Sequence, residues 1–141
     1  MLLVPRPVIR WATDADQAEI LRVMQESKTG CAWMTYGDMD GLALVDESHG
    51  LLRGYVRFTP GRPETWIRQL VVHPDHQGNG TTVKRLLLAV VDVAKTYGSQ
   101  VIEGFVHEDH PVVRSMLARV GAQEDAGVRV RVPILHAGRF R

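Results

Sequence analysis

The sequence has only one cysteine, Cys31, and no long apolar run. A single cysteine cannot form an internal disulfide, so stability must come from a packed core, and a reducing compartment is the natural setting. The apolar opening, residues 1–4, is followed by Pro5, and the apolar stretch 86–91 stops at Asp92. Both are too short for a membrane span or a signal-peptide core. We therefore expect a cytoplasmic protein with no membrane anchor and no export signal.

The sequence also has almost no excess charge, because 17 Lys and Arg oppose 16 Asp and Glu and the net charge is +1. This balance gives no reason to expect an anionic membrane or a nucleic acid as a partner. Nucleic acid is favoured only by the arginines near the end of the chain, Arg129, Arg131, Arg139 and Arg141. With 141 residues, 45% of them apolar and 23% charged, we expect one globular domain over residues 1–141.

Several motifs of familiar chemistry are missing. The histidines are not spaced as metal ligands, so we expect no metal site. No Cys-His-Asp pattern accompanies Cys31, and a nucleophilic cysteine is not indicated. Gly78 and Gly80 lack both the third glycine of a dinucleotide-binding loop and the Lys-Ser or Lys-Thr pair of a Walker loop.

The pattern of apolar and turn residues predicts an α+β layout without an internal repeat. A capping box at residues 13–16 should start the first helix, whose apolar positions are Ile20, Leu21 and Met24. The second helix should run from Gly80 to Tyr97, and Pro111 should open a third. Strands are predicted over residues 8–11, 42–45, 52–58, 65–72, 100–106 and 128–134, with a hairpin turn near Gly50 and the second to fourth as antiparallel neighbours.

The stretch from Ile67 to Val83 carries the clearest functional signal. It passes from a strand through a glycine-rich loop into a helix, so backbone N–H groups converge where the helix dipole is positive. Gly78 and Gly80 allow the backbone to approach an anion closely. The pattern predicts a site for a diphosphate.

This stretch resembles the acyl-CoA motif of the GNAT superfamily of N-acyltransferases, which reads Gln or Arg, two residues, Gly, one residue, then Gly or Ala. Gln77, Gly80 and Thr82 occupy these positions, although Thr82 is bulkier than the usual residue. The resemblance covers nearly the whole chain. It implies a mixed, mostly antiparallel central sheet of about six strands flanked by helices, and an acyl-CoA co-substrate, most simply acetyl-CoA.

The resemblance also implies where the co-substrate lies. In the family, the fourth strand diverges from the fifth at a bulge, and the pantetheine arm pairs with main-chain groups there. The matching residues are Leu70, Val71 and Val72, and a backbone N–H of Leu70 or Val72 would stabilise the oxyanion. The pyrophosphate would lie on Gln77, Gly78, Asn79, Gly80, Thr81 and Thr82, and His110 stands where relatives often have an Asn that contacts the pantetheine.

The usual catalytic acid and base of the family are missing. The middle of the fourth strand reads Trp-Ile-Arg-Gln at residues 66–69 instead of carrying a Glu, and Leu117 replaces the usual Tyr. Glu103 and His107 share one strand face by the period of two and are the preferred candidates for proton transfer. Asp46, Glu64 and Glu108 are further candidates.

Three functions stay open at this point. The first is an N-acyltransferase that acts on an amine of a small molecule or a protein, with the acceptor entering beside residues 29–40. The second is a non-catalytic acyl-CoA sensor or interaction module, which the missing Glu and Tyr favour. The third is a GNAT-like enzyme that modifies nucleic acid. A homodimer also stays open.

Overall fold

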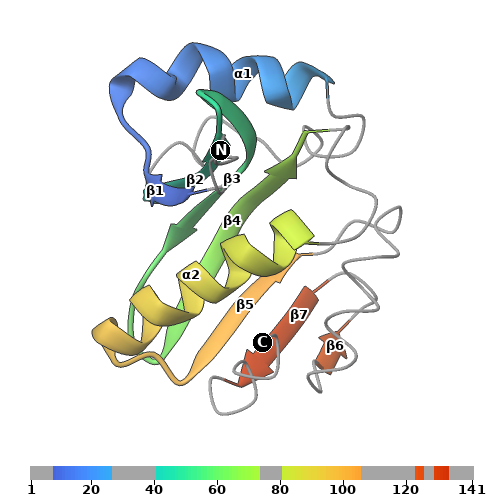
Figure 1. The fold of residues 1–141 in the computed structure, drawn as a ribbon. Helices are drawn as coiled ribbons and strands as arrows, with labels where there is room; N and C mark the ends of the chain where they lie inside the picture. The colour runs from blue at the N-terminus through green and yellow to red at the C-terminus, as the bar shows by residue number, and fades with distance from the viewer. Residues whose placement is uncertain (1–7, 27–40, 74–80, 106–122, 126–128, 134–141) are drawn as a thin grey trace.

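The computed structural model describes residues 8–26, 41–73, 81–105, 123–125 and 129–133 (Figure 1). The elements are β1 (Val8–Trp11), the 3-10 turn η1 (Asp14–Asp16), α1 (Gln17–Glu26), β2 (Leu42–Ser48), β3 (Leu51–Thr59), β4 (Glu64–Val72), α2 (Thr81–Tyr97), β5 (Val101–Phe105), β6 (Gln123–Asp125) and β7 (Arg129–Pro133). The predicted helix that starts at Pro111 lies outside the described residues. No described helix is long and apolar enough to span a bilayer.

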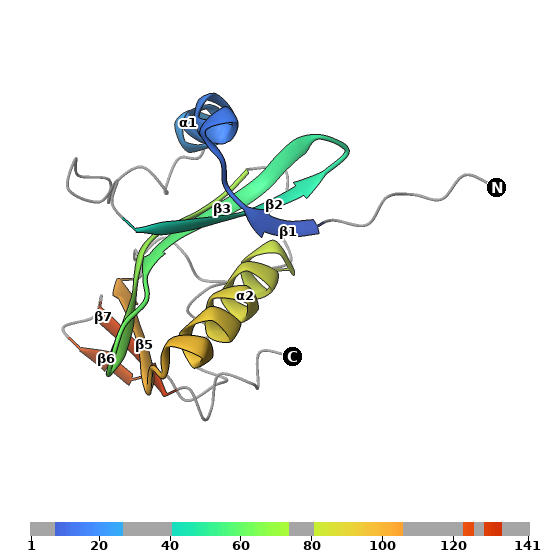
Figure 2. The same cartoon turned by 90° about the vertical axis from the view of Figure 1, so that its left-hand side faces the viewer.

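The described strands form one seven-stranded sheet in the order β1-β2-β3-β4-β5-β7-β6. Helix α1 covers one face of the sheet and helix α2 the other (Figure 2). The predicted antiparallel meander is confirmed as β2, β3 and β4, and only β4 and β5 pair in parallel. About six strands were expected, and β6 is the strand that was not predicted. Its sequence, Gln-Glu-Asp, has no alternation of apolar residues.

The hairpin turn and the end of α2 match the sequence prediction. His49 and Gly50 form the two-residue connection between β2 and β3, and both have positive φ, 57° and 76°. Two central residues with positive φ match the right-handed twist of the flanking strands. Gly98, with φ of 79°, follows the last residue of α2, and Arg62 Nε donates a 2.9 Å hydrogen bond to the carbonyl of Tyr97.

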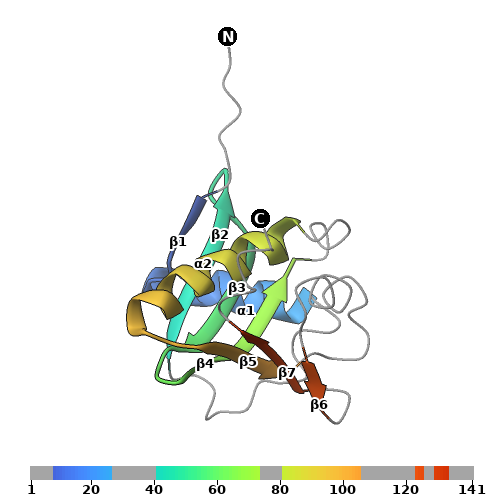
Figure 3. The ribbon, with the colours of Figure 1, turned by 90° about the horizontal axis from the view of Figure 1, so that it is seen from below.

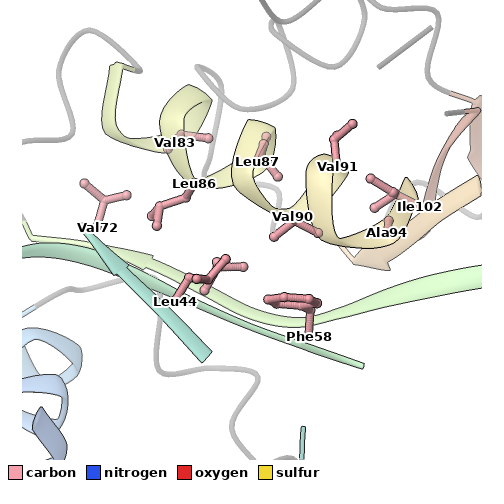
Figure 4. Close-up of a cluster of buried hydrophobic side chains, with 11 residues drawn as sticks. Leu44, Phe58, Val72, Val83, Leu86, Leu87, Val90, Val91, Ala94 and Ile102 are labelled. Carbon is pink, nitrogen blue, oxygen red and sulfur yellow. The ribbon is translucent and has the colours of Figure 1, made fainter. Parts of the chain in front are cut away.

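The larger apolar core lies between α2 and the sheet (Figure 4). Apolar residues recur along α2 at helical spacing and meet the inner residues of β2, β3 and β4. This packing holds the first turn of α2 against the end of β4. The buried members are Leu44, Val56, Phe58, Val72, Val83, Leu86, Leu87, Val90, Val91, Ala94 and Ile102.

The smaller core lies under α1 on the opposite face and contains Ile20, Val23, Val45, Leu52, Tyr55 and Val71. Leu21 was predicted for the apolar face of α1, and this was wrong, because its exposed fraction is 41%. Residues 20 and 23 are one helical turn apart, whereas residue 21 is rotated by about 100° from residue 20. The side chain of Met24 lies outside the described set.

Arg10 joins β1, η1 and β2 through two carboxylates. Its guanidinium donates two hydrogen bonds of 2.8 Å to Asp16, and Nε donates one of 2.9 Å to Glu47. The backbone N–H of Thr13 also donates to Asp16, so the predicted capping box is confirmed. Hydrogen bonding from Arg10 holds the pKa of Asp16 well below its usual range and raises that of Arg10.

Candidate functional site

Strands β4 and β5 part midway along their length. They pair at Glu64↔Val101, Thr65↔Ile102 and Trp66↔Glu103. Beyond Trp66, β4 continues to Val72 and β5 to Phe105 with no further pairs, and the two strands diverge (Figure 1, and seen from below in Figure 3). The pairing of β4 with β5 therefore ends at Trp66, while its pairing with β3 continues to Val72.

A β-bulge in β4 lies where the strands begin to part. Ile67 pairs with Phe58 and Gln69 with Arg57, so Arg68 is the extra residue. A bulge bends the strand that carries it and increases the local twist. The bulge therefore turns the second half of β4 away from β5.

Leu70, Val71 and Val72 are held in place from both faces of the sheet. Leu70 and Val72 pack in the core under α2, while Val71 packs in the core under α1. The three residues also pair with Val56, Tyr55 and Gly54 of β3. The result is a rigid strand edge of the kind to which an extended chain can add as a further strand.

The first turn of α2 meets this strand edge. Thr82 is fully buried, and its Oγ1 has no hydrogen-bond partner among the described residues. A buried hydroxyl without a partner is uncommon in native proteins, and this one can still donate and accept a hydrogen bond. Backbone N–H groups at the start of a helix are also unsatisfied within the helix, so this turn suits an anion.

Gly54 explains how Thr82 fits where the family motif has Gly or Ala. A Cβ at Gly54 would lie 3.1 Å from Thr82 Cγ2 and 2.8 Å from the carbonyl oxygen of Val71. The absence of a side chain on β3 therefore leaves room for the methyl group on α2. The close approach of helix and strand is kept although the motif residue is larger.

An ion pair between the half-buried Arg85 and the buried Asp46 fixes α2 to the sheet. Arg85 Nε donates to Asp46 Oδ2 over 3.1 Å, and its Nη2 donates to Oδ1 over 3.3 Å. Asp46, on β2, was a sequence candidate for proton transfer, but the structure gives it this structural partner. No motif in the sequence indicated the pair, because the two residues are 39 positions apart.

Glu103 lies at the last pair before β4 and β5 part, and its exposed fraction is 1%. Its neighbour Ile102 packs under α2, so Glu103 belongs to the opposite face of the sheet. His107, predicted to share this strand face, lies outside the described residues, as do Gln77, Gly78, Asn79, Gly80, His110 and the acceptor segment 29–40. No group of metal-binding side chains occurs among the residues that the structure describes.

One buried polar residue of β4 was not recognised from the sequence. Gln69 is 1% exposed, and neither its Oε1 nor its Nε2 has a hydrogen-bond partner within the described part of the chain. In the sequence, Gln69 stands out only as part of the stretch 66–69, which lacks the Glu that the family resemblance implies there. Burial of the amide depends on the packing of α1 and the sheet, which the local sequence does not reveal.

The bulged strand edge beside the first turn of α2 is the arrangement that the sequence resemblance implies for the acyl-CoA site. Residues 7–122 match the acetyltransferase (GNAT) family. The match covers most of the chain, so the chain belongs to this family and is an acetyltransferase of the GNAT type. No curated protein matches the sequence.

Solved structures share the fold at low sequence identity. The ribosomal-protein-S18-alanine N-acetyltransferase from Escherichia coli superimposes with a TM-score of 0.76 at 16% identity. The match covers 92% of this chain and 94% of that chain. The PaiA N-acetyltransferase from Thermoplasma acidophilum, in complex with coenzyme A, superimposes with a TM-score of 0.72 at 17% identity. The match covers 90% of this chain and 98% of that chain. YncA from Salmonella typhimurium, solved with acetyl-CoA, superimposes with a TM-score of 0.71 at 18% identity, and the match covers 92% of this chain and 95% of that chain. The predicted fold class is therefore confirmed.

Proposed function

We propose that the chain transfers the acetyl group of acetyl-CoA directly to an amine. The observation that carries this proposal is the open edge of β4 beside the first turn of α2, with the buried and unpartnered Oγ1 of Thr82 at that turn. The similar proteins from T. acidophilum and S. typhimurium, solved with coenzyme A and acetyl-CoA, support it.

The residues of this site fit acetyl-CoA. Main-chain groups of Leu70, Val71 and Val72 would hold the pantetheine arm, because these residues lie beyond Trp66, where the pairing of β4 with β5 ends. Thr81 and Thr82 would contribute to pyrophosphate binding at the start of α2. The sequence adds Gln77, Gly78, Asn79 and Gly80 to this anion site and His110 to the pantetheine site.

The bound co-substrate would supply an acetyl group activated as a thioester. The chain must then position a neutral amine, accept its proton and exclude water. Glu103 is the buried carboxylate at the point where β4 and β5 part, so we assign it as the proton acceptor. His107, four positions after Glu103 in the sequence, is the second proton-transfer residue that we assign, because the period of two of a strand predicts the same face for both.

Two conservative variants test the assignment of Glu103 and His107. Glu103→Gln and His107→Gln keep the size of the side chain and remove its basicity. At least one should lower the rate of acetyl transfer by about 10²–10⁴-fold without weakening coenzyme A binding. Asp92→Asn, an exposed carboxylate on α2, is the matched control and should keep the rate.

Two results would contradict parts of this proposal. Wild-type rates and an unchanged pH profile for both variants would show that neither Glu103 nor His107 transfers a proton. The proposed co-substrate site would not be affected by that result. Tight acetyl-CoA binding with no thiol release in the presence of any amine would instead identify a sensor. That outcome would overturn the proposed transfer reaction.

A further inference from the structure

Two buried hydroxyl groups, those of Thr65 on β4 and Ser99 after α2, meet inside the protein. Their side-chain oxygens are 2.6 Å apart, and the two residues are 0% and 7% exposed. The Ser99 hydroxyl donates its one proton to the carbonyl of Gly61, so Thr65 must be the donor to Ser99 Oγ. Two hydrogen bonds in series therefore connect β4, through Ser99, with the segment between β3 and β4.

Backbone hydrogen bonds join the same two connections of the chain. The carbonyl of Pro63 accepts from the N–H of Gln100 over 2.7 Å and from the N–H of Val101 over 3.3 Å. The segment between β3 and β4 thus lies beside the segment between α2 and β5 (Figure 1). We call these hydrogen bonds of Thr65, Ser99 and Pro63 the base clamp.

Ser99 is also fixed to the end of α2. Its N–H donates to the carbonyl of Ala94 over 3.0 Å, and the N–H of Gly98 donates to the carbonyl of Lys95 over 3.0 Å. These two bonds form a Schellman motif, which the positive φ of Gly98 permits. The end of the helix therefore sets the position of Ser99 in the base clamp.

The base clamp lies next to the point where β4 and β5 part. The parallel pairing of these strands is only three residue pairs long, from Glu64↔Val101 to Trp66↔Glu103, and Thr65 is the middle residue of β4 in it. Parallel pairing is also slightly less stable per residue than antiparallel pairing. Three such pairs give little resistance to a change in the angle between the strands, so the clamp supplies the fixed end.

The angle at this base decides whether an extended chain fits between the two strands. Paired strands lie about 4.8 Å apart, so a chain inserted between two strands needs a separation of about twice that value. The part of β4 from Ile67 to Val72 has a length of about 20 Å. A rotation of about 2° at the base moves the far end of this part by about 0.7 Å, which exceeds the normal spread of hydrogen-bond lengths, about 0.5 Å.

We propose that Thr65 and Ser99 are positioning residues of the co-substrate site, because the base clamp sets the separation of β4 from β5 that the pantetheine arm requires. This inference rests on the proposed function. Helix α2 connects the two ends of the site, since its first turn, with Thr82, meets the far end of β4 and its last turn holds Ser99. The clamp acts through the strands and not through contact with acetyl-CoA.

Thr65→Val tests the role of the hydroxyl, because it keeps the shape of the side chain and removes the hydrogen-bond donor. Calorimetry should show that coenzyme A binds about tenfold more weakly than to the wild type, the equivalent of one lost hydrogen bond. Ser99→Ala, which removes both bonds of the Ser99 hydroxyl, should weaken binding at least as much. Thr65→Ser restores the donor and should restore the affinity.

Thr13→Val is the matched control. It makes the same substitution at a threonine whose hydroxyl is hydrogen bonded to Asp16 near the start of α1, far along the chain from β4 and β5. Coenzyme A should bind this variant as tightly as the wild type.

The kinetic constants separate positioning from a general loss of stability. Thr65→Val should raise the KM for acetyl-CoA about tenfold and leave kcat almost unchanged, because binding of the co-substrate is what the clamp supports. A partly unfolded population would instead lower kcat and leave KM unchanged. All variants are compared well below their Tm.

Wild-type affinity for coenzyme A in folded Thr65→Val and Ser99→Ala proteins would overturn the inference, and so would equal losses in Thr65→Val and Thr13→Val. A wild-type protein that binds acetyl-CoA and acetylates no amine would reject the proposed function, and the binding comparison would still decide the role of the clamp. The two failures are therefore distinguishable.

Discussion

Thr82 and Gly54 form the residue pair on which the close packing of α2 against the sheet depends. The family motif has a small residue where this chain has Thr82, and the missing side chain of Gly54 makes up for the difference. The shortest approach is to backbone, because a Cβ at Gly54 would be 2.8 Å from the carbonyl oxygen of Val71. Backbone in the middle of a paired strand cannot shift cheaply.

Gly54→Ala should therefore destabilise the protein by about 1–3 kcal/mol, the usual cost of overpacking a core. Urea unfolding measures this change. Gly104→Ala is the matched control in β5, where a Cβ would meet Ile67 at ordinary distances of 3.4 and 3.5 Å, and its effect should be small. Equal losses for the two variants would contradict the account of the Gly54 contact.

Residue-scale features of the site were only partly predictable from sequence. Thr82 was identified from the motif, and the structure adds that its hydroxyl is buried without a partner among the described residues. Gln69 and the Asp46–Arg85 pair were missed, because burial and long-range pairing arise from packing between elements. The roles assigned to Glu103 and His107 stay predictions.

At the scale of elements, the ion pair between Asp46 of β2 and Arg85 of α2 sets the position of the helix. Removing Arg85 leaves the carboxylate of Asp46 buried without this cation. Arg85→Met should therefore destabilise the fold by about 3–5 kcal/mol. Replacing both, as Asp46→Leu with Arg85→Met, should regain much of that loss, and denaturant unfolding of the three proteins tests this. A double variant as unstable as the single one would contradict it.

Asp16 stabilises the junction of β1, η1 and α1 in a pH-dependent way. Because Arg10 lowers the pKa of Asp16 in the folded protein, the carboxylate contributes stability above its unfolded pKa of about 3.9. This contribution is lost as the pH falls from that value toward the folded pKa. Asp16→Asn should cost about 2 kcal/mol at pH 7.

Urea unfolding at pH 7 and at pH 3 measures this effect. The gap between the wild type and Asp16→Asn should narrow at pH 3, while Asp14→Asn, an exposed neighbour in the same turn, should show little effect at either pH. A gap of the same size at both pH values would show that the charge of Asp16 does not act through Arg10.

Elements with strong periodicity were predictable, and short ones were not. The meander β2–β4 and helix α2 followed from alternating and helical patterns, because each buries one continuous face. Strand β6 has three polar residues and gave no pattern. The assignment of Leu21 to the buried face of α1 was wrong, since three apolar residues alone do not define which face meets the sheet.

At the scale of the whole molecule, the fold brings three distant features together: the bulged edge of β4, the start of α2 and the buried Glu103 of β5. The α+β layout was predicted from the order of elements, and the mixed central sheet was predicted from the resemblance carried by the loop motif. The divergence of β4 from β5 follows from the bulge at Arg68, which the residue pattern alone did not indicate.

The most direct test of the central claim follows an isotopic label from acetyl-CoA to an amine. Mass spectrometry should detect the carbon-13 acetyl group on at least one member of an amine panel after incubation with the wild-type protein. Gly80→Asp, which adds a negative charge at the proposed pyrophosphate site, should fold and give no labelled product. No labelled amine from the wild type, or equal labelling by folded Gly80→Asp protein, would contradict the account.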